Sequence, residues 1–128
     1  MPSGLLLCDD LMFASRITGE ARAAGLTVHS ARSMEQLLEL ARRETPSCVL
    51  VDLAFPALSL PTLMERLGEI GGTRPRVVAY GSHVDTESLR AARAAGCDPV
   101  LPRSKFVEEL PRALPNWLSA APSDAGAT

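Results

Sequence analysis

The sequence has no long apolar run and no cluster of basic residues. Its apolar stretches fall far short of the ~18 residues that cross a bilayer, so we expect no membrane association. No positively charged start precedes an apolar stretch, which argues against a signal peptide. The net charge is −2 and the arginines form no continuous patch, which argues against nucleic-acid binding.

Cysteine motifs are also lacking. The three cysteines show neither a CxxC pair nor the Cys/His spacing of a metal site. Cys8 and Cys48 lie inside apolar runs, where cysteine usually acts as a small buried hydrophobe. A redox pair between them is the alternative. We therefore expect a reduced, cytoplasmic protein.

With 128 residues, 46% of them hydrophobic, the chain is long enough for one domain with a substantial core. From Ser119 onward it contains only small and polar residues, which cannot bury enough apolar surface to become ordered. We expect one domain over residues 1–118 and a disordered tail or linker over residues 119–128. Such a tail would also suit a fragment of a longer protein.

Strand and helix signals alternate along the chain, which favours an α/β fold with a doubly wound parallel sheet. The expected strands are residues 5–8, 26–28, 48–51, 77–80 and 100–101. The expected helices begin at Leu11, after the Ser33 and Gln36 capping box, at Pro61, at Asp85 or Thr86, and near Ser104 or Lys105. Gly71 and Gly72 are expected to close the third helix, and Pro111 to bend or delay the last.

Two of the apolar runs end in aspartate. The first expected strand runs into Asp9 and Asp10, and the third into Asp52. Open α/β sheets place their ligands at the carboxyl ends of the strands, so three carboxylates should converge at one edge. Three such anions repel one another unless protons or a cation neutralise them. Oxygen ligands alone favour a hard divalent ion, above all Mg²⁺. Asp10 as a simple helix cap, and Asp52 as a structural loop residue, are the alternatives.

Three local sequences in this order resemble the receiver domain of two-component response regulators. They are Cys8-Asp9-Asp10, Val49-Leu50-Val51-Asp52-Leu53 with Pro56, and Gly96-Cys97-Asp98. The resemblance implies a flavodoxin-like sheet of five parallel strands, in the order 2-1-3-4-5, with five helices. It also implies that Asp52 is the phosphoacceptor. Asp9 and Asp10 would bind Mg²⁺ together with Asp52 and the backbone carbonyl of Ala54.

The rest of the family's site departs from the usual pattern. Gly81, followed by Ser82, stands where the family has the threonine or serine that contacts the phosphoryl group. Arg103 stands in place of the lysine, and the single lysine of the chain, Lys105, comes two residues later. Arginine keeps the positive charge but differs from lysine in reach and geometry. Val100 replaces the aromatic residue that often changes rotamer on the fifth strand.

The first functional hypothesis is an atypical, stand-alone receiver, a signalling domain rather than an enzyme. A histidine kinase or a phosphotransfer protein would phosphorylate Asp52, and a downstream protein partner would recognise the result. The surface of the fourth helix, fifth strand and fifth helix could also form a homodimer. The alternative is a phosphorylation-independent pseudo-receiver that acts as a protein-interaction module. A small Mg²⁺-dependent phosphohydrolase is a weaker third hypothesis, since no other catalytic set follows the acids.

Overall fold

The computed structural model describes residues 3–70 and 74–119. The predicted helix stop at Gly71 and Gly72 and the predicted tail from residue 120 onward lie outside the described residues. Ser119, which was expected to begin the tail, is the last residue of the final helix.

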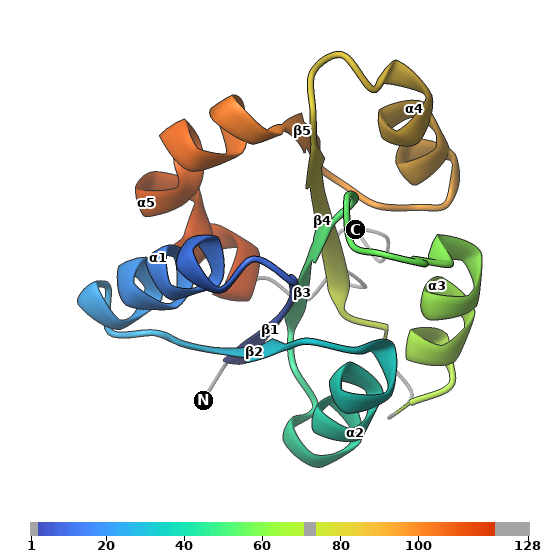
Figure 1. Ribbon diagram of the computed structural model, residues 1–128. Coiled ribbons are helices and arrows are strands. Elements are labelled where there is room, and N and C mark those ends of the chain that lie inside the picture. Colours follow the sequence, from blue (N-terminus) through green and yellow to red (C-terminus); the bar gives the residue numbers. More distant parts are fainter. Residues whose placement is uncertain (1–2, 71–73, 120–128) are drawn as a thin grey trace, which may run out of the picture.

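Five parallel strands form one sheet at the centre of the molecule (Figure 1). They are β1 (Ser3–Leu7), β2 (Thr27–Ala31), β3 (Cys48–Asp52), β4 (Arg76–Gly81) and β5 (Val100–Pro102). Their order is β2-β1-β3-β4-β5, which confirms the predicted flavodoxin-like topology. The central strand β3 is buried over its whole length because both faces of a doubly wound sheet are covered by helices.

Five helices cover the two faces of the sheet (Figure 1). They are α1 (Leu11–Ala23), α2 (Met34–Glu44), α3 (Leu60–Gly68), α4 (Thr86–Ala94) and α5 (Arg103–Ser119). Polar side chains cap three of them as the sequence indicates. Asp10 accepts from two backbone N–H groups of α1, Ser33 from that of Gln36, and Asp85 from that of Ser88.

The core consists of two layers of different composition. The layer under α2, α3 and α4 is aliphatic, apart from the partly buried Phe55. The layer under α1 and α5 contains the other four of the five aromatic residues, which are Phe13, Tyr80, Phe106 and Trp117. Burial of each large apolar side chain contributes roughly 1.5–3 kcal/mol. The two layers bury both faces of the sheet, so its strands are held by packing from both sides.

Several element bounds differ from the sequence-based expectation. β1 begins at Ser3 and ends at Leu7, so Cys8 directly follows it, and α3 begins at Leu60. β2 continues to Ala31, beyond the predicted end at Val28, because it pairs with β1 over five residues. The extension was not predicted because His29 and Ser30 are polar and interrupt the apolar run that indicates a buried strand. α5 begins at Arg103 and continues through Pro111 to Ser119, so the expectation that Pro111 delays the helix is wrong.

Within the described part of the chain, no helix combines the length and the apolar character needed to cross a membrane.

Candidate functional site

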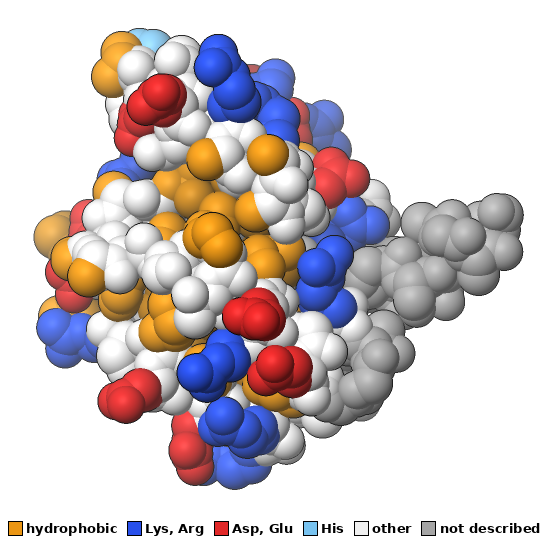
Figure 2. All heavy atoms as spheres, turned by 90° about the vertical axis from the view of Figure 1, so that its right-hand side faces the viewer, with side chains coloured by type: hydrophobic (Ala, Val, Ile, Leu, Met, Phe, Trp, Pro, Cys, Tyr) orange, Lys and Arg blue, Asp and Glu red, His pale blue; other side chains and the backbone are white. Residues whose placement is uncertain are grey.

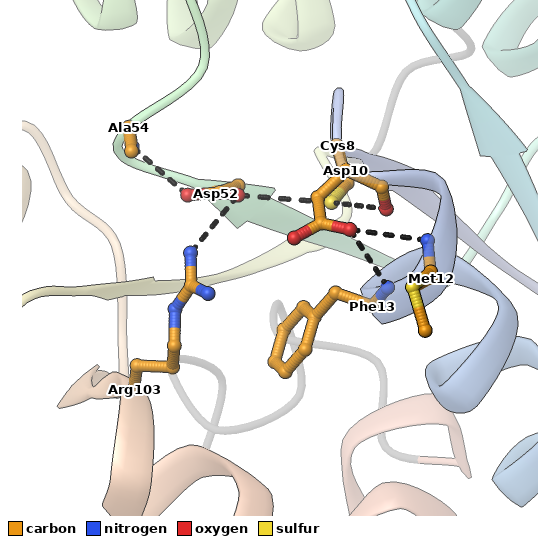
Figure 3. A network of polar contacts seen from close by, with 7 residues as sticks. All are labelled: Cys8, Asp10, Met12, Phe13, Asp52, Ala54 and Arg103. Atoms are coloured by element: carbon orange, nitrogen blue, oxygen red, sulfur yellow. Dashed lines mark hydrogen bonds and ion pairs between the residues drawn. The ribbon is translucent and has the colours of Figure 1, made fainter.

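Asp52 is the one buried charged side chain among the described residues, with 4% of its surface exposed. It is the last residue of β3, at the carboxyl edge of the sheet. Its Oδ1 accepts a hydrogen bond of 2.9 Å from the backbone N–H of Ala54. Its Oδ2 lies 3.6 Å from the thiol of Cys8 and 3.6 Å from Nη2 of Arg103 (Figure 3). A carboxylate is stable in this setting because donors and a cation surround it.

Arg103 comes to Asp52 from the first turn of α5, directly after β5. Sequence counting places this arginine where the family has its lysine, and the structure brings it to the carboxylate. Lys105 instead lies 3.8 Å from Glu108 and 3.7 Å from Glu109 on the surface of α5. The positive charge that faces Asp52 is therefore a planar guanidinium, which can contact two oxygens at once.

Asp10 performs the capping role that was weighed against metal binding. Its Oδ1 accepts from the backbone N–H groups of Met12 and Phe13 at 3.0 and 3.1 Å. Its second carboxylate oxygen has no part in the cap. The backbone carbonyl of Asp10 lies 3.5 Å from the thiol of Cys8, which also faces the Asp52 carboxylate, so this thiol lies between the Asp10 backbone and Asp52. Asp9 is exposed.

The predicted carboxylates are not gathered into a preformed metal cage. Across residues 3–70 and 74–119, no three His, Cys, Asp or Glu side chains are grouped to hold a metal ion. Mg²⁺ does not require such a cage, because it keeps several waters and typically takes one or two carboxylates together with phosphate oxygens. The donor chemistry of Asp10 and Asp52, oxygen only and at one edge of the sheet, fits that pattern.

Two further polar groups lie beneath Asp52. Burial raises the pKa of the Cys8 thiol, and the Asp52 carboxylate adds to the effect. Burial also raises the pKa of the Tyr80 phenol, with Cys8 and Asp52 contributing. The Tyr80 hydroxyl is buried beside the Cys8 thiol and makes no hydrogen bond of standard geometry to the described residues. Both groups therefore stay protonated at neutral pH.

Gly81 and Ser82 do not place a hydroxyl beside Asp52. Gly81 is the buried last residue of β4, and a Cβ there would lie 3.3 Å from both Cβ and Cδ1 of Leu53. Leu53 in turn lines an apolar groove between the β3–α3 loop and α4. Apolar side chains gather on this side of the molecule (Figure 2). Ser82 is exposed, and its Oγ accepts from the backbone N–H of Val84 at 3.3 Å. The Ser82 hydroxyl therefore stabilises the loop after β4 and makes no hydrogen bond with Asp52.

Sequence reasoning did not identify Cys8, Phe13 or Tyr80 as neighbours of the site. Cys8 and Tyr80 belong to apolar strand runs and Phe13 to the apolar stripe of α1, so each is typical of a core residue. The guanidinium of Arg103 lies 4.8 Å from the centroid of the Phe13 ring. The scarcity of aromatic residues, five in 128, is a sequence signal that draws attention to Phe13 and Tyr80 but not to Cys8.

No protein-family model and no curated protein matches the sequence. Solved structures do match it. The receiver domain of the Francisella response regulator 1452 has 19% identity and a TM-score of 0.75, over 92% of this chain and 97% of that one. The chemotaxis response regulator CheY4 of Vibrio cholerae has 16% identity and a TM-score of 0.75, over 92% and 99%.

A third match is the receiver domain of Ssk1 from Saccharomyces cerevisiae, solved in complex with the histidine phosphotransfer signalling protein Ypd1. It has 14% identity and a TM-score of 0.76, over 91% of this chain and 88% of that one. Identities this low establish the fold and leave the chemistry open. The chain has the fold of response regulator receiver domains, as its sequence motifs indicate.

Proposed function

We propose that this protein is a receiver-type signalling domain that accepts a phosphoryl group on Asp52. The observation that carries the proposal is the buried Asp52 carboxylate at the carboxyl edge of the sheet, facing the Arg103 guanidinium at 3.6 Å. A carboxylate oxygen would attack the phosphorus atom. The bond from phosphorus to the donor would break, and its electron pair would leave with the donor. A cation is needed beside Asp52 because the incoming oxygens are also negative.

Each residue at this edge has a proposed part in the transfer. Arg103 contacts the phosphoryl oxygens, and the backbone N–H of Gly81, or the Ser82 hydroxyl after a loop movement, donates to them. Asp10, Asp52, the carbonyl of Ala54 and, directly or through water, Asp9 hold Mg²⁺. When bound, Mg²⁺ supplies charge neutralisation and orients the phosphoryl group.

The proposed partners follow from this chemistry. The phosphoryl donor is a histidine kinase or a phosphotransfer protein, and the Ypd1 complex of a protein with the same fold supports that class of donor. The phosphorylated domain signals by a changed affinity for a downstream protein. The surface of α4, β5 and α5 is the proposed contact in a homodimer.

Titration of Mg²⁺ and beryllofluoride tests the proposal, because beryllofluoride mimics a phosphoryl group on a carboxylate. We expect a saturable change in Trp117 fluorescence or in amide chemical shifts of the wild type, and none in Asp52→Ala. A wild type that does not respond, or an Asp52→Ala variant that responds equally, would refute phosphorylation at this residue.

One observation favours the second candidate, a phosphorylation-independent interaction module. Position 81 carries no hydroxyl to sense the phosphoryl group, and a Cβ there would lie 3.3 Å from Leu53, so a larger side chain would have to displace Leu53. Once a protein partner is found, its affinity separates the two functions. Equal affinity for wild type and Asp52→Ala, with no effect of beryllofluoride, would favour the constitutive module.

A further inference from the structure

The ion pair with Asp52 and the ring of Phe13 are the two nearest supports of Arg103. The first is the ion pair itself, with 3.6 Å between Nη2 and Oδ2. The second is the ring of Phe13, whose centroid lies 4.8 Å from the central carbon of the guanidinium. The ring of Tyr80 lies farther away, with its centroid 6.0 Å from the same carbon. A guanidinium over an aromatic face is attracted by the negative charge of that face. The two supports restrain the same planar group, one at its edge and one on its face.

The ion pair alone is a weak restraint. A separation of 3.6 Å is longer than a hydrogen bond, and the Arg103 side chain is 43% exposed, so water competes for its donors. Arginine also loses considerable rotamer freedom when it is held in one place. A free Arg103 would therefore spend part of its time away from the carboxylate, and a phosphoryl group would have to order it on arrival.

Phe13 itself is well fixed. It lies in the first turn of α1, and its backbone N–H donates to Oδ1 of Asp10 at 3.1 Å. Its ring lies 5.3 Å from the ring of Tyr80 and 6.4 Å from that of Phe106, centroid to centroid. Tyr80 stacks on Phe106 in turn, at 4.3 Å. The ring under Arg103 is thus part of the packed aromatic layer.

We infer that Phe13 is a positioning residue, which holds the guanidinium of Arg103 against Asp52 before any ligand arrives. The inference deepens the proposed function and rests on it where phosphoryl binding is concerned. The inference also gives a reason for arginine and not lysine at position 103, because a planar guanidinium stacks on an aromatic ring and an ammonium group does not. Asp10 acts on the same arrangement indirectly, since its cap fixes the helix turn that carries Phe13.

Two measurements on Phe13→Leu test the inference. Without ligand, NMR should show the side-chain protons of Arg103 shifted upfield by the ring in wild type and in Phe13→Tyr, which keeps an aromatic face. The shift should fall in Phe13→Leu to the smaller contribution of the Tyr80 ring, whose centroid lies 6.0 Å from the central carbon of the guanidinium. With Mg²⁺ and beryllofluoride, Phe13→Leu should bind about two- to tenfold more weakly, since Arg103 must now be ordered on binding. Phe13→Tyr should restore the affinity.

A double-mutant cycle separates positioning from general damage to the fold. In the Arg103→Ala background, Phe13→Leu should cause no further loss of beryllofluoride affinity. The matched control is Phe55→Leu, the same substitution at the aromatic residue of the opposite layer, which should leave the Arg103 shifts unchanged.

The possible outcomes are distinct. Wild-type Arg103 shifts in Phe13→Leu, or an equal loss of affinity with and without Arg103, would overturn the inference. A wild type that does not bind beryllofluoride would overturn the proposed function, and the positioning of Arg103 would then be decided by the chemical shifts alone.

Discussion

Replacement of Tyr80 by phenylalanine should stabilise the protein. The Tyr80 ring is fully buried and stacks on Phe106, while its hydroxyl makes no hydrogen bond of standard geometry to the described residues and faces the Cys8 thiol, a weak partner. A buried polar group without a partner costs about 1–3 kcal/mol of folding free energy. Phenylalanine keeps the ring and removes the oxygen, at the cost of a few weak atomic contacts. We expect the free energy of unfolding to rise by about 1 kcal/mol.

Urea denaturation followed by Trp117 fluorescence measures this change, with circular dichroism at 222 nm as an independent probe. The slope of the transition should stay the same, because the surface exposed on unfolding hardly changes. Tyr80→Leu is the control, since it removes both the hydroxyl and the stacked ring and should destabilise. A Tyr80→Phe variant that is less stable than wild type by 1 kcal/mol or more would show that the hydroxyl is satisfied in the folded protein. The reasoning would then fail.

Two further predictions concern Gly81 and Cys48. Gly81→Ala should destabilise by about 1–2 kcal/mol, because the added Cβ meets Leu53 at 3.3 Å. In urea unfolding, Leu53→Ala should offset part of that loss, and a Gly81→Ala variant as stable as wild type would contradict the packing argument. Burial raises the pKa of the Cys48 thiol from 9 to about 12. Its contribution to stability is complete below pH 9 and is lost between about pH 9 and 12, as the unfolded thiol ionises first. Unfolding free energies at pH 8 and 10.5 should therefore differ less in Cys48→Ala than in wild type, and an equal difference would count against this assignment.

The fold could be predicted because its determinants are local. A buried parallel strand requires a continuous apolar run, so residues 48–51 identify β3 and place Asp52 at its end. Ser33 and Asp85 cap the first turns of their helices by accepting hydrogen bonds from backbone N–H groups three residues later. Counting forward from Gly96-Cys97-Asp98 also places Arg103 directly after the fifth strand, where α5 begins in the structure.

The surroundings of Asp52 could not be predicted, because they depend on contacts between distant segments. Cys8 directly follows β1 and Tyr80 belongs to β4, and each is an ordinary core residue when only the sequence is considered. The sequence left two roles open for Asp10, helix capping and metal binding. The hydrogen bonds to Met12 and Phe13 show the cap, which the residue type alone does not. The metal-binding roles of Asp9, Asp10, Asp52 and the carbonyl of Ala54 stay predictions, as does phosphorylation at Asp52.

Because the core is divided into an aliphatic and an aromatic layer, the spectroscopic signals of aromatic side chains come mainly from one half of the molecule. Trp117 and Tyr80 both contact Phe106, so intrinsic fluorescence and near-ultraviolet dichroism originate almost entirely under α1 and α5. Partial loosening of α2, α3 and α4 would leave these signals intact while far-ultraviolet dichroism fell. A lag between the two spectra during unfolding would therefore identify which side of the sheet opens first.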